Sequence, residues 1–255
     1  PEGTYENKAV LFSLDPKTGA VLDRLTEIKG DIRSSISYDK DSGKVFFASK
    51  GGWFCTVKVN EDGTFDTSSF RYVDLEGMCT GTPLVYNSRA YIGSSGAQGQ
   101  FGPGKLNVID LSGETPVLAY YAELPGYPQA SALLTSAYGD TAYVYITYNN
   151  NPGGIYAIED KAGQTTAKGY HLFIPGSGMQ QYAIASLVAD ADGTIYYKND
   201  SCYLMGVSRN TAYLTGLSAD KGILNKAFAG GTLDYELVVP VNTESVTLVA
   251  TPSEG

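Results

Sequence analysis

Apolar and polar positions alternate along most of this chain in short runs, and turns rich in Gly, Asp or Asn separate the runs. Short alternating runs bounded by these residues are typical of β-strands, whereas an amphipathic helix repeats its apolar positions about every three or four residues. Four of the runs begin with such a turn and continue into an aromatic strand, at residues 41–47, 87–92, 139–144 and 192–197. The pattern therefore predicts an all-β chain.

The same order of strands recurs along the chain. Each aromatic strand follows a short apolar strand across a tight turn, because Asp, Asn and Gly accept the positive φ that such turns need. A third strand ends at Asp, Asn or Glu in most repeats, and a glycine and a fourth strand come after it. The first aromatic residues of the repeats are Phe46, Tyr91, Tyr143 and Tyr196, so the repeats start 45, 52 and 53 residues apart.

Four strands in every ~45–53 residues are the period of a β-propeller blade. An ordinary β-sandwich with regular hairpins is the alternative, although a sandwich does not need one strand order to repeat. We predict an all-β fold with about four to five four-stranded blades represented, followed by a partial β-sandwich. The N-terminal strands are expected to be outer strands of a blade, and residues 185–207 are expected to supply inner strands.

One segment carries a family resemblance. Residues 11–22 read Leu-Phe-Ser-Leu-Asp-Pro-Lys-Thr-Gly-Ala-Val-Leu, with looser copies at 109–113 and 158–163. They resemble the repeat of quinoprotein-like (PQQ-like) propellers, and the resemblance covers about residues 8–207. The quinone-dependent dehydrogenases of that family carry a Trp in each blade and an adjacent-cysteine pair, but this chain has the single Trp53 and no such pair. The resemblance therefore implies the non-enzymatic branch of scaffolds and surface-binding modules, with no cofactor.

The pattern changes near residue 208. Residues 217–228, 235–240 and 246–251 resemble part of a bacterial cadherin-like, Ig-like β-sandwich module, although that family usually has Pro where Lys226 stands. We therefore predict two domains, with propeller blades at 1–208 and a partial cadherin-like sandwich at 209–255. The start at Pro1 and the end just after a strand indicate a fragment, and we favour further blades before Pro1 over a closed ring of four.

An incomplete ring would leave two blade faces exposed. The residues expected at these end faces are Leu11, Leu14, Val21, Leu187, Ile195 and Leu204. We expect them either to meet in a closed ring or to be covered by another chain or by segments outside this sequence.

Charge and cysteine content exclude several functions. The net charge is −9, with 27 acidic against 18 basic residues and no basic cluster, so nucleic acid and anionic membrane surfaces are poor partners. No run approaches the roughly 20 apolar residues of a membrane helix, so direct insertion is not expected. The three cysteines Cys55, Cys79 and Cys202 lack metal-ligand spacing, and buried thiols are favoured over a disulfide.

The central funnel of a propeller is lined by the starts of the first strands. In this chain those starts are rich in hydroxyls and amides, which suit a neutral polar ligand such as a sugar better than acid–base chemistry. A channel lining that is merely solvated is the alternative. The candidate ligand-binding residues are Asp31, Arg33, Thr80, Thr82, Gln129, Ser131, Gln180, Gln181 and Tyr182.

Other candidate sites give weaker signals. His171 lies on an expected outer strand without a nucleophile motif, so a structural role is favoured. The Gly-rich segment 94–104 lacks the Gly-Lys-Ser/Thr ending of a phosphate loop and is interpreted as a long flexible connection. The turns at 39–43 and 190–193 alternate carboxylates as calcium loops do, but they lack the later bidentate Glu, so we predict no metal and no catalytic residue.

The sequence favours a non-catalytic extracellular or cell-surface binding or scaffold protein of a bacterium, whose propeller recognises a protein or carbohydrate ligand. The alternative is a propeller enzyme that uses Asp31 and Arg33 in the funnel. Such an enzyme would be a quinone- or metal-dependent oxidoreductase or a glycan-acting lyase or hydrolase, because the fold alone excludes none of these.

Overall fold

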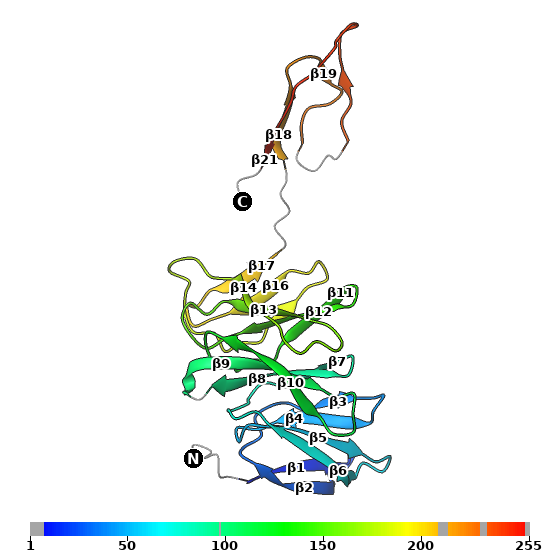
Figure 1. Cartoon of the computed structure of the whole chain (residues 1–255), viewed down its shortest axis with the longest axis vertical. Coiled ribbons are helices and arrows are strands. Elements are labelled where there is room, and N and C mark those ends of the chain that lie inside the picture. The colour runs from blue at the N-terminus through cyan, green and yellow to red at the C-terminus, as the bar shows by residue number, and fades with distance from the viewer. Residues whose placement is uncertain (1–7, 97, 209–213, 230–233, 253–255) are drawn as a thin grey trace. The chain divides into compact units, whose positions relative to one another are not determined.

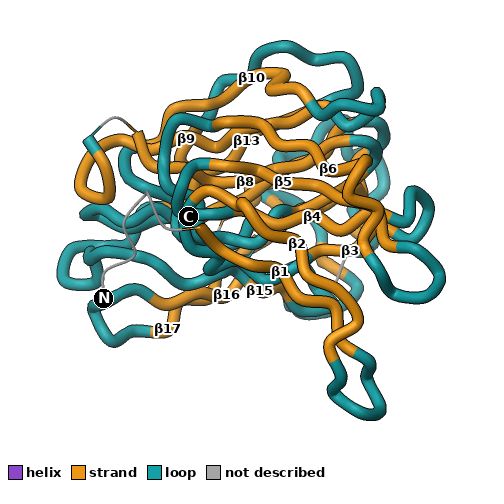
Figure 2. Tube along the Cα trace, turned by 90° about the horizontal axis from the view of Figure 1, so that it is seen from below, coloured by secondary structure: helices purple, strands orange, loops and turns teal. Residues whose placement is uncertain are grey.

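The computed structural model describes residues 8–96, 98–208, 214–229 and 234–252. The chain divides into two compact units, Pro1–Val207 and Ser208–Gly255. Strands and loops make up the part of the chain that the structure describes (Figure 2), and it contains no helix that could span a membrane.

The first unit contains three antiparallel sheets of four strands each, paired in chain order. Blade 1 is β3 (Ser37–Asp39), β4 (Lys44–Ala48), β5 (Trp53–Val59) and β6 (Phe65–Asp74). Blade 2 is β7 (Leu84–Tyr86), β8 (Arg89–Gly96), β9 (Gly99–Asp110) and β10 (Val117–Leu124). Blade 3 is β11 (Leu133–Tyr138), β12 (Thr141–Thr147), β13 (Ile155–Asp160) and β14 (Tyr170–Phe173).

Smaller sheets flank these blades. The strands β1 (Lys8–Leu14) and β2 (Val21–Lys29) pair before blade 1. After blade 3, β15 (Val188–Ala189), β16 (Ile195–Lys198) and β17 (Leu204–Val207) form a three-stranded sheet. The sheets follow one another as a stack from β1–β2 to β15–β17 (Figure 1). Repeated four-stranded meanders stacked in this way are β-propeller blades, so the predicted fold class is confirmed.

Local sequence sets these hairpins. Gly43 and Gly139 have φ values of +66° and +70° in the turns between the first and second strands of blades 1 and 3. In blade 2 the same turn is made by two residues with side chains, Asn87 and Ser88, with φ values of +47° and +57°. The positive φ predicted for these turns is therefore present, in one blade without glycine.

Apolar clusters lie between neighbouring sheets, where alternate residues of each strand meet the next blade. Full burial of a large apolar side chain stabilises a fold by roughly 1.5–3 kcal/mol, so these clusters hold the stack together. Their members include Leu25, Ile28, Phe47 and Val57 between β2 and blade 1; Phe46, Phe54, Ala90 and Ile92 between blades 1 and 2; Leu106, Val108, Val144 and Ile146 between blades 2 and 3; and Ile155, Leu187, Ile195 and Tyr197 after blade 3.

The two ends of the stack stay apart. Within the described residues, no sheet pairing and no apolar cluster joins β1–β2 to β15–β17. Of the six residues expected at the end faces, Leu14, Val21 and Leu204 are exposed. The expectation is wrong for Leu11, Leu187 and Ile195, because these residues point inward and pack against the neighbouring blade.

The interpretation of the Gly-rich segment 94–104 as a flexible connection is wrong. Residue 97 lies outside the described residues, residues 94–96 continue β8 and residues 99–104 begin β9, with Ser94 opposite Lys105 and Ser95 opposite Gly104. A Cβ added to Gly104 would lie 2.4 Å from Pro128 Cδ. This glycine therefore permits the close approach of a neighbouring loop and does not mark a flexible connection.

Two pairs of strands lie within the described residues of the second unit. The strand β18 (Leu214–Ala219) pairs with β21 (Leu248–Pro252), and β19 (Ile223–Leu224) pairs with β20 (Leu237–Val238). None of the described residues of this unit is fully buried. The cadherin-like assignment of residues 209–255 stays a prediction.

Candidate functional site

The predicted funnel residues lie in the loops that lead into the first strand of consecutive sheets. Arg33, Gln180 and Tyr182 are exposed. The other six are half-buried: Asp31, Thr80, Thr82, Gln129, Ser131 and Gln181.

Several of their hydroxyls connect neighbouring sheets. The backbone N–H of Ser35 donates to Thr82 Oγ1 at 3.0 Å. The N–H of Thr82 donates to Ser131 Oγ at 2.9 Å, and the N–H of Ser131 donates to Ser186 Oγ at 3.2 Å. These four residues, which we call the hydroxyl ladder, repeat one bond from sheet to sheet. The hydroxyls therefore have a structural role, and ligand binding by the funnel set stays a prediction.

Similar contacts engage the other funnel residues Thr80, Gln129, Gln180 and Gln181. Thr80 Oγ1 donates to the carbonyl of Gln129 at 3.1 Å, which joins blades 2 and 3. Gln180 Nε2 donates to the carbonyl of Pro175 at 3.0 Å, and Gln181 Oε1 accepts the N–H of Tyr182 at 3.2 Å. Among the described residues, no hydrogen bond connects the side chain of Asp31 or of Arg33 to the hydroxyl ladder.

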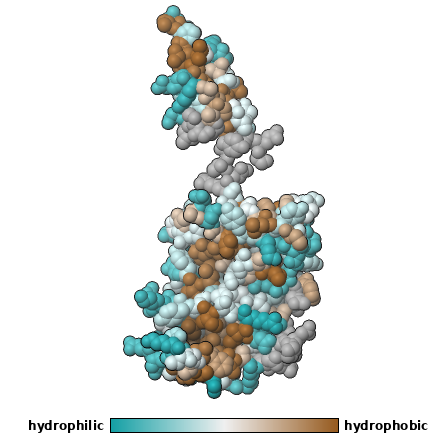
Figure 3. Space-filling view, turned by 180° about the vertical axis from the view of Figure 1, so that it is seen from behind, coloured by the Kyte–Doolittle hydropathy of each residue, from teal (hydrophilic) through white to brown (hydrophobic). Residues whose placement is uncertain are grey.

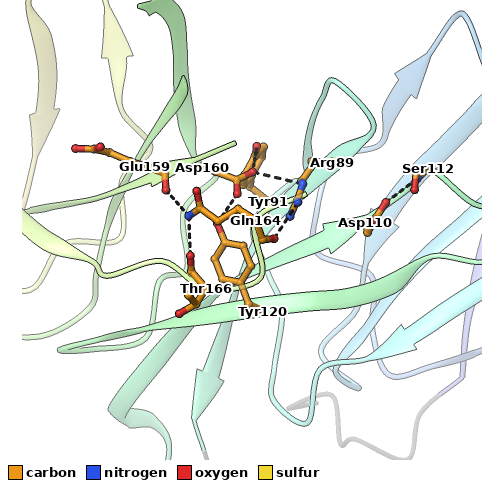
Figure 4. Close-up of polar contacts among 9 residues, drawn as sticks. All are labelled: Arg89, Tyr91, Asp110, Ser112, Tyr120, Glu159, Asp160, Gln164 and Thr166. Carbon is orange, nitrogen blue, oxygen red and sulfur yellow. Dashed lines mark hydrogen bonds and ion pairs between the residues drawn. The ribbon is translucent and has the colours of Figure 1, made fainter. Parts of the chain in front are cut away.

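A buried polar cluster that the sequence did not indicate lies between blades 2 and 3 (Figure 4). We call Arg89, Tyr91, Tyr120 and Asp160 the polar cluster. Asp160, 1% exposed, accepts the hydroxyl of Tyr120 at 2.6 Å and that of Tyr91 at 2.8 Å. Arg89 Nε lies 3.6 Å from Asp160 Oδ2, and Arg89 Nη2 donates to the carbonyl of Gln164 at 2.9 Å.

The polar cluster serves as a connection between blades 2 and 3. Burial, together with the hydrogen bonds to Asp160, raises the pKa of both Tyr91 and Tyr120, so both phenols stay protonated and donate to the carboxylate. The cavity beside the cluster measures about 20 Å³, which is room for about one water molecule. A substrate therefore does not fit there.

The equivalent place between blades 1 and 2 is open. A cleft of about 460 Å³ lies beside the first turn of each of these blades and the end of β9. The buried residues Phe46 and Thr56 form its floor, and half-buried or exposed hydroxyl, amide and charged groups form its rim. The lining residues are Asp39, Asp41, Ser42, Lys44, Phe46, Thr56, Val85, Tyr86, Asn87, Ser88, Leu111, Gly113 and Pro116. We call this space the cleft.

The repeat explains why one boundary is filled and the other is open. Lys44 and Phe46 of β4 hold the positions that Arg89 and Tyr91 hold in β8, because each pair begins the second strand of its blade. Lysine and phenylalanine offer neither the guanidinium fork nor the hydroxyl that bind Asp160. The polar cluster is therefore not repeated, and the cleft remains.

The rim of the cleft holds its polar groups in fixed directions. Hydrogen bonds from Ser42 hold the pKa of Asp39 below its ordinary value, and the N–H of Ser42 lies 3.1 Å from Asp39 Oδ2. The turn of Asn87 and Ser88 is fixed by the N–H of Leu111, which donates to the Ser88 carbonyl at 2.8 Å. An ionised acceptor and a rigid turn therefore face the same space.

The other residues that the sequence indicated as possible sites make contacts within the fold. His171 lies on β14, where its ring packs edge-on against Tyr156, with ring centroids 5.0 Å apart. In the calcium-like turn at 190–193, Asp190 Oδ1 accepts the N–H of Thr194 at 2.9 Å. Cys55 and Cys79 are buried free thiols whose pKa burial raises, whereas Cys202 is exposed. Among the described residues, no group of three or more His, Cys, Asp or Glu is placed to hold a metal ion.

The fold thus defines a protein built of stacked β-propeller blades. No protein-family model and no curated protein matches the chain. Among solved structures it is similar to the quinohemoprotein alcohol dehydrogenase ADHIIG from Pseudomonas putida HK5, with 12% identity, a TM-score of 0.46, and coverage of 82% of this chain and 41% of that one. It is also similar to BamB from Moraxella catarrhalis, with 8% identity, a TM-score of 0.27, and coverage of 85% and 94%. The chain therefore spans less than half of the dehydrogenase.

Proposed function

We propose that this chain is a non-catalytic binding protein of the cell exterior, and that the cleft holds a neutral, hydroxylated ligand such as the end of a glycan. The cleft volume of about 460 Å³ lies within the range of small-ligand sites. Its apolar lining residues Phe46, Val85 and Leu111 suit the carbon face of a sugar ring, and its hydroxyl, amide and carboxylate groups suit the sugar hydroxyls.

The turn of Asn87 and Ser88 is the observation that carries this proposal. Two consecutive non-glycine residues with positive φ are energetically costly, by about 1 kcal/mol for a residue such as Ser88. Blades 1 and 3 use Gly43 and Gly139 at their corresponding turns, with no such cost. Both side chains of the strained turn line the cleft, so the strain supports a role in holding a ligand.

The proposed location outside the cell, and the bacterial source, rest on the resemblance of the first unit to non-enzymatic quinoprotein-like propellers. The resemblance of residues 217–251 to stalk modules of bacterial surface proteins supports the same location. The acidic balance of 27 acidic to 18 basic residues suits a neutral ligand better than an anionic one.

The variant Ser88→Gly tests the cleft. It should raise the free energy of unfolding by about 1 kcal/mol, because glycine accepts the positive φ. It should also weaken the binding of short neutral oligosaccharides of glucose, galactose or N-acetylglucosamine about five-fold, because one hydrogen bond of about 1 kcal/mol is lost. Calorimetric titration measures the affinity, and urea titration measures the stability.

Glu76→Gly is the matched control. Glu76 also has a positive φ, of +54°, but it does not line the cleft, so its variant should gain stability and keep its affinity. Equal affinities of the wild type and Ser88→Gly for every oligosaccharide would contradict the assignment of the cleft. Turnover of any oligosaccharide, or a bound quinone chromophore in the purified protein, would contradict the non-catalytic assignment.

A further inference from the structure

The floor of the cleft contains a buried hydroxyl without a partner. Thr56 is 1% exposed and lines the cleft, and its Oγ1 has no hydrogen-bond partner among the described residues. A buried hydroxyl that forms no hydrogen bond destabilises a fold, because the same group is hydrated in the unfolded chain. The Thr56 hydroxyl therefore contributes nothing to the stability of the fold that would explain its presence.

The repeat shows that blade packing does not need this hydroxyl. Thr56 lies opposite Phe46 in the pairing of β5 with β4, and Val108 lies opposite Tyr91 in the pairing of β9 with β8. Phe46 and Tyr91 are each the third residue of a second strand, so Thr56 and Val108 occupy equivalent positions. Val108 is fully buried at the filled boundary between blades 2 and 3. Valine has the shape of threonine without its hydroxyl, so the hydroxyl distinguishes the open boundary from the filled one.

The surroundings of this hydroxyl are apolar. Side chains of residues directly opposite in antiparallel strands lie next to each other, so the Thr56 side chain lies beside that of Phe46. Pro116 is the other buried residue of the described lining, so Thr56 is the polar member of this buried set. Apolar surface by itself is not confined to the cleft, since Figure 3 shows apolar residues gathered at the end of the first unit that holds β1 and β2. The cleft is distinguished by a hydrogen-bonding group within an apolar floor.

We infer that the ligand of the cleft is an N-acetylated sugar, whose acetamido carbonyl accepts a hydrogen bond from Thr56 Oγ1 and whose methyl group packs on Phe46. This inference rests on the proposed function of the cleft. Two hydroxyls in contact share one hydrogen bond, so a sugar hydroxyl at this place would leave one O–H without an acceptor. A carbonyl only accepts, so the Thr56 hydroxyl satisfies it completely. The acetamido N–H remains for the rim, which carries the ionised carboxylate of Asp39.

Thr56→Val tests this inference in the full chain. The wild type should bind the β-1,4-linked trimer of N-acetylglucosamine at least about five-fold more tightly than the β-1,4-linked trimer of glucose. Thr56→Val should remove this preference by weakening the binding of the acetylated trimer alone, whereas Thr56→Ser keeps the hydroxyl and should keep the preference. Calorimetric titration measures the affinities. The midpoint of urea unfolding should not fall in Thr56→Val, because the variant removes a buried group without a partner.

Thr147→Val is the matched control. Thr147 is also fully buried, but its Oγ1 donates to the carbonyl of Ala185 at 2.8 Å, and it does not line the cleft. Its variant should therefore lower the urea midpoint and keep both affinities. The same substitution at two buried threonines thus separates a hydroxyl that binds ligand from a hydroxyl that stabilises the fold.

Three results would overturn the inference: equal affinities of the wild type for the two trimers, an unchanged preference in Thr56→Val, or a lower urea midpoint in Thr56→Val. An unchanged preference would mean that the hydroxyl meets only water. In each of these cases the proposed function would still stand if Ser88→Gly weakens the binding of the glucose trimer. Failure of both trimers to bind the wild type would instead overturn the proposed function together with this inference.

Discussion

Removal of the Asp160 carboxylate tests how strongly neighbouring blades are coupled. Asp160 belongs to blade 3, whereas its partners Arg89, Tyr91 and Tyr120 belong to blade 2. Asp160→Ala therefore leaves a buried guanidinium without its counter-charge and two buried phenols without their acceptor. Such a change is destabilising because the remaining groups are desolvated in the folded state and hydrated in the unfolded state.

The expected magnitude follows from these contacts. Breaking a buried ion pair by removing one partner costs about 3–5 kcal/mol, and each orphaned hydroxyl costs about 1–3 kcal/mol, although the terms are not additive. The hydroxyl bonds at 2.6 and 2.8 Å are shorter than the 3.6 Å separation from Arg89. We therefore expect a loss of about 3–5 kcal/mol for Asp160→Ala and about 1–3 kcal/mol for Tyr120→Phe.

A double-mutant cycle separates pairing from burial. Arg89→Met with Asp160→Leu removes both charges, so the double variant should be less destabilised than the sum of the single variants by at least about 2 kcal/mol. Urea titration followed by far-UV circular dichroism and by the fluorescence of Trp53 in blade 1 measures each variant. A loss below about 1 kcal/mol for Asp160→Ala, or additive effects in the cycle, would refute the structural role assigned to the polar cluster.

Three further predictions concern the stack. Thr82→Val keeps the side-chain shape but cannot accept the N–H of Ser35, so it should cost about 1 kcal/mol and accelerate hydrogen exchange at the Ser35 amide. Leu14→Asp should lower the free energy of unfolding of the isolated chain by less than about 0.5 kcal/mol, because Leu14 is 52% exposed. A loss above about 2 kcal/mol would show that this end face is covered in solution. Burial raises the pKa of Tyr145 from 10.0 to about 12, so the stability that this protonated phenol contributes is fully present below pH 10 and is lost as the pH rises from there through about 12. Urea titrations at increasing pH, with absorbance at 295 nm, measure this loss.

The architecture could be predicted because it depends on local and periodic signals. The turns need positive φ, which Gly43 and Gly139 supply, and the aromatic strands recur at a blade period. The extension of β8 to Gly96 and the start of β9 at Gly99 could not be predicted, because a glycine can serve a flexible loop or a close contact. Only the position of Pro128 beside Gly104 distinguishes the two.

The sites were harder to predict, because they depend on which blades are neighbours. The hydroxyls of Thr82 and Ser131 were recognised as polar residues at strand starts, but their partners come from adjacent sheets. The recurrence of a hydroxyl at one position of every repeat was the signal available for the ladder. Asp160 resembles Asp15 and Asp110 at the ends of their strands, and only the arginine contributed by blade 2 makes it a buried ion pair.

The contrast between the two blade boundaries provides the final test of the cleft. Lys44→Arg with Phe46→Tyr gives blade 1 the two second-strand groups that blade 2 uses in the polar cluster, with Asp110 of blade 2 at the strand end that corresponds to Asp160. Both substitutions change side chains that line the cleft, so oligosaccharide binding should weaken. If the new hydroxyl reaches the carboxylate, the free energy of unfolding should change by less than about 1 kcal/mol, whereas a buried hydroxyl without a partner should cost about 1–3 kcal/mol. Unchanged oligosaccharide affinity in a folded double variant would show that the ligand lies elsewhere, because Lys44 and Phe46 both line the cleft.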